Sequence, residues 1–178
     1  MAAASGMIVN FVAFQIGWFA AVVGAGHGMP WLGVVVVPLV LLLNLLLSRD
    51  WMQELVVALL AAMLGFVFDS ALTFSGVFVP VPYVFPRPFS PLWMVMLWVN
   101  QAATLNGCMA WLRGRYLLGA VFGGIGGPLA YLGGAKLGAA ALPSNHDLVV
   151  LGLAWAVAFP ALLAVSEFVR GYFTGIRD

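Results

Sequence analysis

The chain is a series of long apolar segments separated by short connections that contain glycine, proline or charged residues. About 20 apolar residues are needed for a helix to cross a hydrocarbon core of about 30 Å, and these segments have that length. Runs such as LGVVVVPLVLLLNLLL lack the alternation of apolar and polar residues that is typical of barrel strands. We therefore predict an all-α integral membrane protein, a six-helix bundle in one domain over 1–178, with spans at 7–24, 31–47, 51–76, 92–112, 116–142 and 148–170.

The composition supports a lipid environment. Of the 178 residues, 64% are hydrophobic and only 7% are charged, whereas soluble proteins have about 25% charged residues. The net charge is +1 and there is no basic tract, so no nucleic-acid partner is expected. The start of the chain lacks the positive residues of a signal peptide, and we expect its first apolar segment to be a retained helix.

The arginines indicate the orientation of the six spans. All but Arg87 fall on the same side as the two termini: Arg49, Arg113, Arg115, Arg170 and Arg177. Positively charged residues are enriched in cytoplasmic connections. Both termini are therefore predicted to be cytoplasmic.

The fifth segment is unusually rich in glycine. Small residues at every fourth position let a neighbouring helix approach closely. Two such rows form the predicted packing seam: Gly119, Gly123 and Gly127, and Gly126, Ala130, Gly134 and Gly138. Pro128 lacks a backbone N–H, so we expect a kink in this helix.

Two charged residues, Asp69 and Lys136, fall at a similar depth in the outer half of the predicted bundle. An unpaired ion in this environment is costly, which favours an Asp69–Lys136 pair. The pair is either a static salt bridge or a titrating, substrate-binding site. Alternatively, the lysine extends outward to the membrane surface.

Further polar residues lie in the fourth segment and in the outward connections. Asn100, Gln101 and Thr104 follow helical spacing, and they either bond neighbouring helices or line a polar cavity. His27, His146 and Arg87 complete the candidate polar site on the outward side. The two histidines and a carboxylate could bind zinc. Histidines in loops are commonly only solvated, however, so we assign no metal. We also assign no cofactor. The proline-rich connection that contains Arg87 is either a stiff connector or a lid.

Several segments together resemble a family of small bacterial inner-membrane proteins that is catalogued only as a domain of unknown function: NFVAFQIGWF, FDSALTFSGVF, PLWMVMLWVNQAATLN and GGPLAYLGGAKLGA. The GGPLAY motif is the most specific part of the resemblance. It implies a multi-pass protein of the bacterial inner membrane. Genes of this family are sometimes neighbours of cyclopropane-fatty-acid-synthase-like enzymes, which points to lipid modification. The resemblance supplies no catalytic residues.

Three functions are compatible with these features. The first is binding or transport of a lipid or small amphiphile in an outward polar cavity, with membrane lipids as partners. The second is a lipid-modifying enzyme in which Asp69 acts as an acid or base beside Lys136. The third is a non-catalytic scaffold that assembles through the packing seam with a second copy or with a lipid-modifying enzyme. We favour the first, and enzyme activity stays an open alternative.

Overall fold

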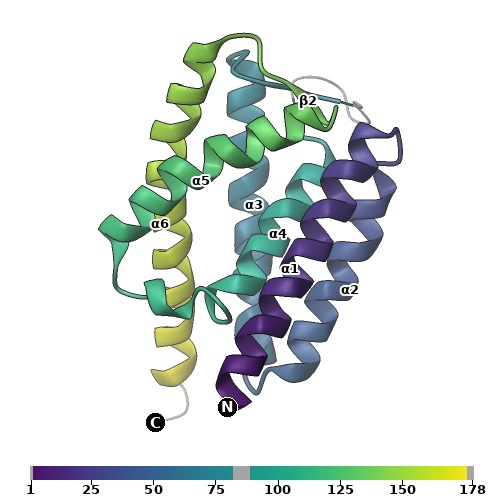
Figure 1. Ribbon diagram of the computed structural model, residues 1–178. Helices are drawn as coiled ribbons and strands as arrows, with labels where there is room; N and C mark the ends of the chain where they lie inside the picture. Colours follow the sequence, from purple (N-terminus) through teal and green to yellow (C-terminus); the bar gives the residue numbers. More distant parts are fainter. Residues whose placement is uncertain (1, 82–88, 176–178) are drawn as a thin grey trace.

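The computed structural model describes residues 2–81 and 89–175, and it is almost entirely helical (Figure 1). The described residues form six α-helices: α1 (Ala2–Gly26), α2 (Trp31–Leu47), α3 (Trp51–Phe74), α4 (Leu92–Leu105), α5 (Tyr116–Lys136) and α6 (Asn145–Gly175). They also contain a short 3-10 helix, η1 (Ala110–Leu112), and two short strands, β1 (Val79–Pro80) and β2 (Ala140–Ala141). The predicted helical class is confirmed.

In Figure 1, α3 and α6 stand nearly upright, α1, α2 and α4 are inclined together, and α5 is the most oblique and crosses α6. The main contacts are between α5 and α6, α1 and α2, and α3 and α4. Buried apolar residues form two clusters, one around Trp98 and Leu162 and one around Phe78 and Tyr131. The start of α1 and the end of α6 lie at the same end of the bundle (Figure 1).

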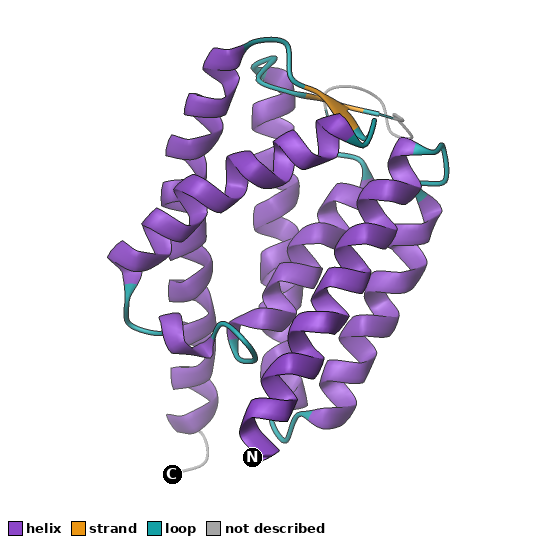
Figure 2. Cartoon of the chain, in the orientation of Figure 1, coloured by secondary structure: helices purple, strands orange, loops and turns teal. Residues whose placement is uncertain are grey.

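The two strands join connections that are far apart in the sequence (Figure 2). They pair antiparallel, with Val79 opposite Ala141 and Pro80 opposite Ala140. The N–H of Val81 extends the pairing by donating to the carbonyl of Ala139, at 2.8 Å. Backbone groups in an apolar environment need such partners. The pairing, absent from our prediction, holds the ends of α3 and α5 at the same end of the bundle.

Helix α5 ends at Lys136, although the apolar segment continues to residue 142. Gly138 has a φ of +80°, which a residue with a side chain rarely adopts. Its N–H bonds the carbonyl of Ala135 at 3.1 Å, and the N–H of Ala139 bonds the carbonyl of Gly134 at 2.9 Å. This is a Schellman motif, which terminates a helix regardless of hydrophobicity. Gly76, with a φ of +75°, ends α3 in the same way.

Helix α4 also ends earlier than predicted, at Leu105 rather than at residue 112. The side chain of Asn10 enters the turn that follows, where its Oδ1 accepts a hydrogen bond from the N–H of Cys108 at 2.9 Å. A side chain on Gly107 would collide with Asn10, since a Cβ there would lie 2.3 Å from Asn10 Oδ1. A polar residue of α1 thus occupies the space in which α4 would have continued.

Helix α6 begins before the predicted residue 148, because Ser144 caps it. The Ser144 hydroxyl accepts from the N–H of His146 at 3.0 Å, and the Asp147 carboxylate accepts from the N–H of Ser144 at 2.6 Å. This reciprocal pattern resembles a capping box. The polar residues between α5 and α6 therefore have a structural role.

Candidate functional site

Asp69 is the buried acidic residue around which the candidate site is built. It lies in α3 and is only 1% exposed. Its Oδ2 accepts a hydrogen bond from the indole Nε1 of Trp98 in α4, at 2.8 Å. Its Oδ1 accepts from the hydroxyl of Tyr131 in α5. Two neutral donors thus satisfy the carboxyl group and connect three helices.

The predicted ion pair between Asp69 and Lys136 is not formed in the structure. Lys136 is the last residue of α5 and its side chain is exposed. A cation at this position interacts favourably with the helix dipole and needs no buried partner. The position of Lys136 at the helix end thus explains why this charge needs no partner in Asp69.

Aromatic rings form the frame of the site. Trp98 stacks on Trp155 with ring centroids 4.8 Å apart, and Phe68 meets both rings edge to face. Gly65 makes room for Trp98, because a Cβ at Gly65 would lie 2.1 Å from the indole Cγ. Sequence reasoning missed the roles of Trp98 and Tyr131, since aromatic residues are ordinary in apolar helices. Their polar atoms are the only signal that could have identified them.

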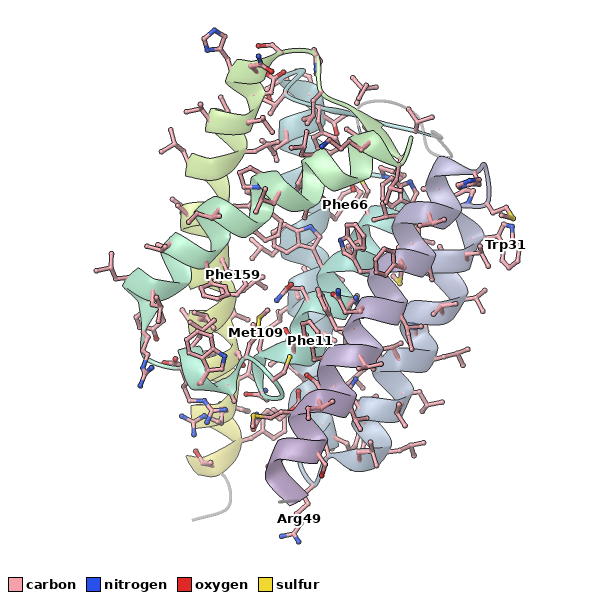
Figure 3. All side chains as sticks on the ribbon, in the orientation of Figure 1. Phe11, Trp31, Arg49, Phe66, Met109 and Phe159 are labelled. Carbon is pink, nitrogen blue, oxygen red and sulfur yellow. The ribbon has the colours of Figure 1, made fainter. Side chains whose placement is uncertain are left out.

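A cavity of about 420 Å³ lies beside this frame. Its lining is mostly apolar and comes mainly from α1, α4, α5 and α6. Asp69 of α3, Gln15 and Gln101 are among the few polar side chains. The α5 lining extends from Phe122 to Gly134, a length of about 18 Å at 1.5 Å per residue. Figure 3 shows two lining residues, Met109 and Phe159, between the α5–α6 pair and α1. The cavity is therefore elongated and apolar, with a polar group on its wall.

The cavity reaches the outer surface of the bundle along α5. Three of its lining residues in that helix, Phe122, Gly126 and Ala130, are exposed. A Cβ at Gly126 would meet nothing within 4 Å. Since this surface lies on the side of an apolar helix, the opening faces the region that lipid chains would occupy.

Trp93 adds a hydrogen-bond donor to the wall. It is 3% exposed and lines the cavity. Its indole Nε1 is buried and has no hydrogen-bond partner within the described part of the chain. Buried polar groups are rarely left in this state, so the atom is suited to bind a ligand oxygen.

The predicted packing seam divides into two faces. Gly119, Gly123 and Gly127 lie against α6, and a Cβ at Gly123 would come within 2.3 Å of the Trp155 carbonyl. Gly126 and Ala130 are exposed and line the cavity. The remaining members, Gly134 and Gly138, lie near α1, and the helix is continuous across Pro128.

The polar residues of α4 have separate roles. Asn100 bonds α1, since its Nδ2 donates to the carbonyl of Phe14 at 2.9 Å. Thr104 is fully buried and donates to the Gln101 carbonyl at 2.6 Å. Gln101 lines the cavity, and its amide donates to Thr104 and Met109. Asn100 thus bonds a neighbouring helix, Thr104 bonds within its own helix, and Gln101 lies on the wall of a mostly apolar cavity.

The histidines lie apart from the cavity lining. His27 is exposed and contacts the carbonyl of Val23 at 2.9 Å, and His146 is exposed at the start of α6. Within residues 2–81 and 89–175 there is no group of three histidine, cysteine or acidic residues placed to hold a metal ion. Arg87 and most of the proline-rich connection lie outside the described residues, so the lid alternative stays a prediction.

Helix length and composition define the class of this protein. Among the described helices, four are long and apolar enough to cross a membrane: Ser5–Gly26, Trp51–Phe74, Tyr116–Lys136 and Asn145–Gly175. The chain is therefore a helical membrane protein. It belongs to the family described as "Protein of unknown function (DUF2878)", whose model matches residues 7–161, and this confirms the resemblance. No curated protein and no solved structure matches the chain.

Proposed function

We propose that this protein spans the bacterial inner membrane six times and binds a lipid or small amphiphile in the cavity beside Asp69. The observation that carries the proposal is the mostly apolar cavity of about 420 Å³, which has a few polar side chains in its lining and exposed lining residues along α5. Ligand sites are commonly apolar pockets with a small number of placed polar groups.

The geometry favours a particular kind of ligand. An apolar chain would lie along the surface of α5 between Phe122 and Gly134. Its polar end would accept a hydrogen bond from the Trp93 indole and approach the Asp69–Tyr131 contact. An amphiphile with an oxygen-containing head group satisfies both requirements.

The six-span topology is supported by the arrangement of the helix ends. The start of α1 and the end of α6 lie at one end of the bundle, where Arg49 also lies (Figure 3). Arg113 and Arg170 line one pocket with Ser48, which places them at the same end. We assign this arginine-rich end to the cytoplasm. The shorter helices α2 and α4 complete the six spans.

The ligand proposal is tested by narrowing the cavity. Gly126→Leu places a side chain at the open part of the lining, where a Cβ meets no other atom within 4 Å. Gly171→Leu is the matched control, because Gly171 is also helical, exposed and open, but does not line the cavity. We expect native mass spectrometry of protein purified in mild detergent to show a bound amphiphile in the wild type and in Gly171→Leu. Gly126→Leu should lose most of it. Equal ligand content in all three proteins contradicts the proposal.

A second candidate function is catalysis on the bound amphiphile. The hydrogen bond from Tyr131 to Asp69 places a phenol and a carboxyl group together on the cavity wall, which is an arrangement suited to proton transfer. Asp69→Asn would abolish turnover while the ligand is still bound. If Asp69→Asn loses the bound ligand and the wild-type protein forms no product, the protein binds the amphiphile without reacting with it.

The scaffold alternative receives less support from the described contacts. Gly119, Gly123 and Gly127 pack against α6 of the same chain, so this part of the predicted packing seam is occupied. Assembly with a second copy or with a lipid-modifying enzyme stays a prediction.

A further inference from the structure

A second pocket, of about 350 Å³, lies at the arginine-rich end of the bundle, away from the cavity beside Asp69. Its lining comes from the α2–α3 connection, the start of α3, the turn after α4, the segment after η1 and the end of α6. With the exception of one phenylalanine, the lining residues are polar or charged: Ser48, Asp50, Gln53, Glu54, Asn106, Arg113, Arg170, Phe173 and Thr174.

Opposite charges in this pocket are held apart by an amide. Asn106 Nδ2 donates to Glu54 Oε2 at 3.3 Å, and Arg113 Nη2 donates to Asn106 Oδ1 at 3.1 Å. The hydroxyl of Ser166, which is itself buried, also donates to Asn106 Oδ1 at 3.3 Å and holds the amide in place. Glu54 and Arg113 are therefore separated in fixed positions and do not collapse into a direct ion pair.

Two further groups on the pocket are available to a ligand. The Nε of Arg170 is buried and has no hydrogen-bond partner in the described part of the chain. A buried guanidinium nitrogen with an unused donor is unusual unless it binds something. Gln53 is only 6% exposed and lines the same pocket, so it adds an amide to the wall.

We infer that this pocket binds a phosphate group that carries an ammonium group, as in phosphoethanolamine. Guanidinium groups bind phosphate oxygens in a bidentate manner, and Arg113 and Arg170 supply two of them. The carboxylate of Glu54 shares the lining and would repel a simple anion. It favours a ligand whose positive end faces it. The shared chemistry occurs in the head group of phosphatidylethanolamine and in the free compound.

Titration of the purified full-length protein tests this inference. The protein is reconstituted in phosphatidylglycerol nanodiscs, and free phosphoethanolamine is added in a calorimeter. In parallel, phosphatidylethanolamine is mixed into the discs and its retention is measured by native mass spectrometry. Arg170→Gln and Gln53→Leu remove one ligand contact each, and we expect each to weaken binding about tenfold or more. Arg115→Gln is the control, because Arg115 is exposed and outside the lining, and it should leave binding unchanged.

The outcomes separate the two sources of the ligand. Retention of the lipid without binding of the free compound supports a lipid head-group site. Binding of the free compound in discs without amine lipid supports a soluble ligand. Inorganic phosphate that binds as tightly as phosphoethanolamine overturns the inference, as do folded Arg170→Gln and Gln53→Leu proteins that bind like the wild type. Gln53→Leu nearly preserves side-chain size, so the test holds even if Arg170→Gln fails to fold.

Discussion

Asp69 shows how a single carboxyl group is accommodated in an apolar bundle. Trp98 and Tyr131 each donate one hydrogen bond to it, from α4 and α5 respectively. Because the carboxyl group is almost fully buried, each donor would be left without an acceptor if it were removed. The residue thus joins three helices and also places a polar group on the cavity wall.

Substitution of Asp69 should therefore destabilise the fold, and the size of this effect should not depend on Lys136. In Asp69→Asn, the side-chain NH₂ must face one of the two donors, and we expect a loss of about 1–3 kcal/mol in the free energy of unfolding. Lys136→Met should change it by less than about 0.5 kcal/mol, because the lysine is exposed. Thermal unfolding in detergent, followed by circular dichroism, measures both. A double variant that is less destabilised than Asp69→Asn alone would show that the two residues are coupled, and it would contradict this account in favour of the ion pair that the sequence suggested.

The sequence singled out Asp69 as a charged residue inside the bundle but did not identify its hydrogen-bond partners. Asp69 stands out because charged residues are rare in such a segment. Its pairing with Lys136 was inferred from similar depth, and depth carries no information about the direction of a side chain. Trp98 and Tyr131 come from other helices, and only the three-dimensional packing brings their donors to the carboxyl group.

At the scale of the helix, α5 has two faces with different environments. Gly119, Gly123 and Gly127 lie against α6, and the last two also border the cavity, whereas Gly126 is exposed at the open part of the lining. The absence of side chains on the first face allows close packing of the helices. On the second face it leaves space along the cavity.

Alanine substitutions on the two faces should have opposite effects. In Gly123→Ala the new Cβ would lie 2.3 Å from the carbonyl of Trp155, which cannot move independently of its helix. We expect a loss of about 1–3 kcal/mol from this overpacking. In Gly126→Ala the space is open, so the helix should gain about 0.5–1 kcal/mol from reduced chain entropy. Unfolding temperatures of the two variants, measured in the same detergent, make the comparison. A similar loss in both would mean that the faces are equivalent.

Helix ends were the elements that hydrophobicity predicted least well. The start of α2 and the start of α3 agree with the prediction, because polar and turn-forming residues flank them. The ends of α4 and α5 do not, because apolar residues continue beyond them. Gly138 ends α5 through its backbone conformation, and Asn10 ends α4 from another helix. The glycine signal at Gly138 is local in the sequence, but the hydrophobicity of the following residues outweighed it in the prediction. The effect of Asn10 depends on tertiary structure and has no local signal.

At the scale of the whole molecule, the bundle has one arginine-rich end and one end at which β1 and β2 join the connections after α3 and α5. The chain returns to the same end of the bundle after each pair of helices (Figure 1). The cavity could not be predicted from the sequence, because it depends on the oblique crossing of α5.

The orientation is tested with single cysteines in a Cys108→Ala background. His27→Cys and His146→Cys lie at the end opposite the arginines, and Arg49→Cys and Gly175→Cys lie at the arginine-rich end. We expect a membrane-impermeant maleimide to label the first two in intact cells and the other two only after permeabilisation. Labelling of Arg49→Cys from outside would contradict the cytoplasmic assignment of the arginine-rich end. Labelling of both Arg49→Cys and His27→Cys from outside would mean that α2 does not cross the membrane, which contradicts the six-span arrangement.

The claim that an amphiphile occupies the cavity is tested most directly by the indole N–H resonances of the tryptophans. Trp93 has an unpartnered N–H on the cavity wall, whereas Trp111 is exposed and outside the lining. Spectra of ¹⁵N-labelled protein would be compared before and after extraction of bound amphiphile, and after it is added back. We predict that the Trp93 resonance moves on extraction and returns on addition, while that of Trp111 stays in place. A Trp93 resonance that is the same in all three states would contradict ligand binding in this cavity.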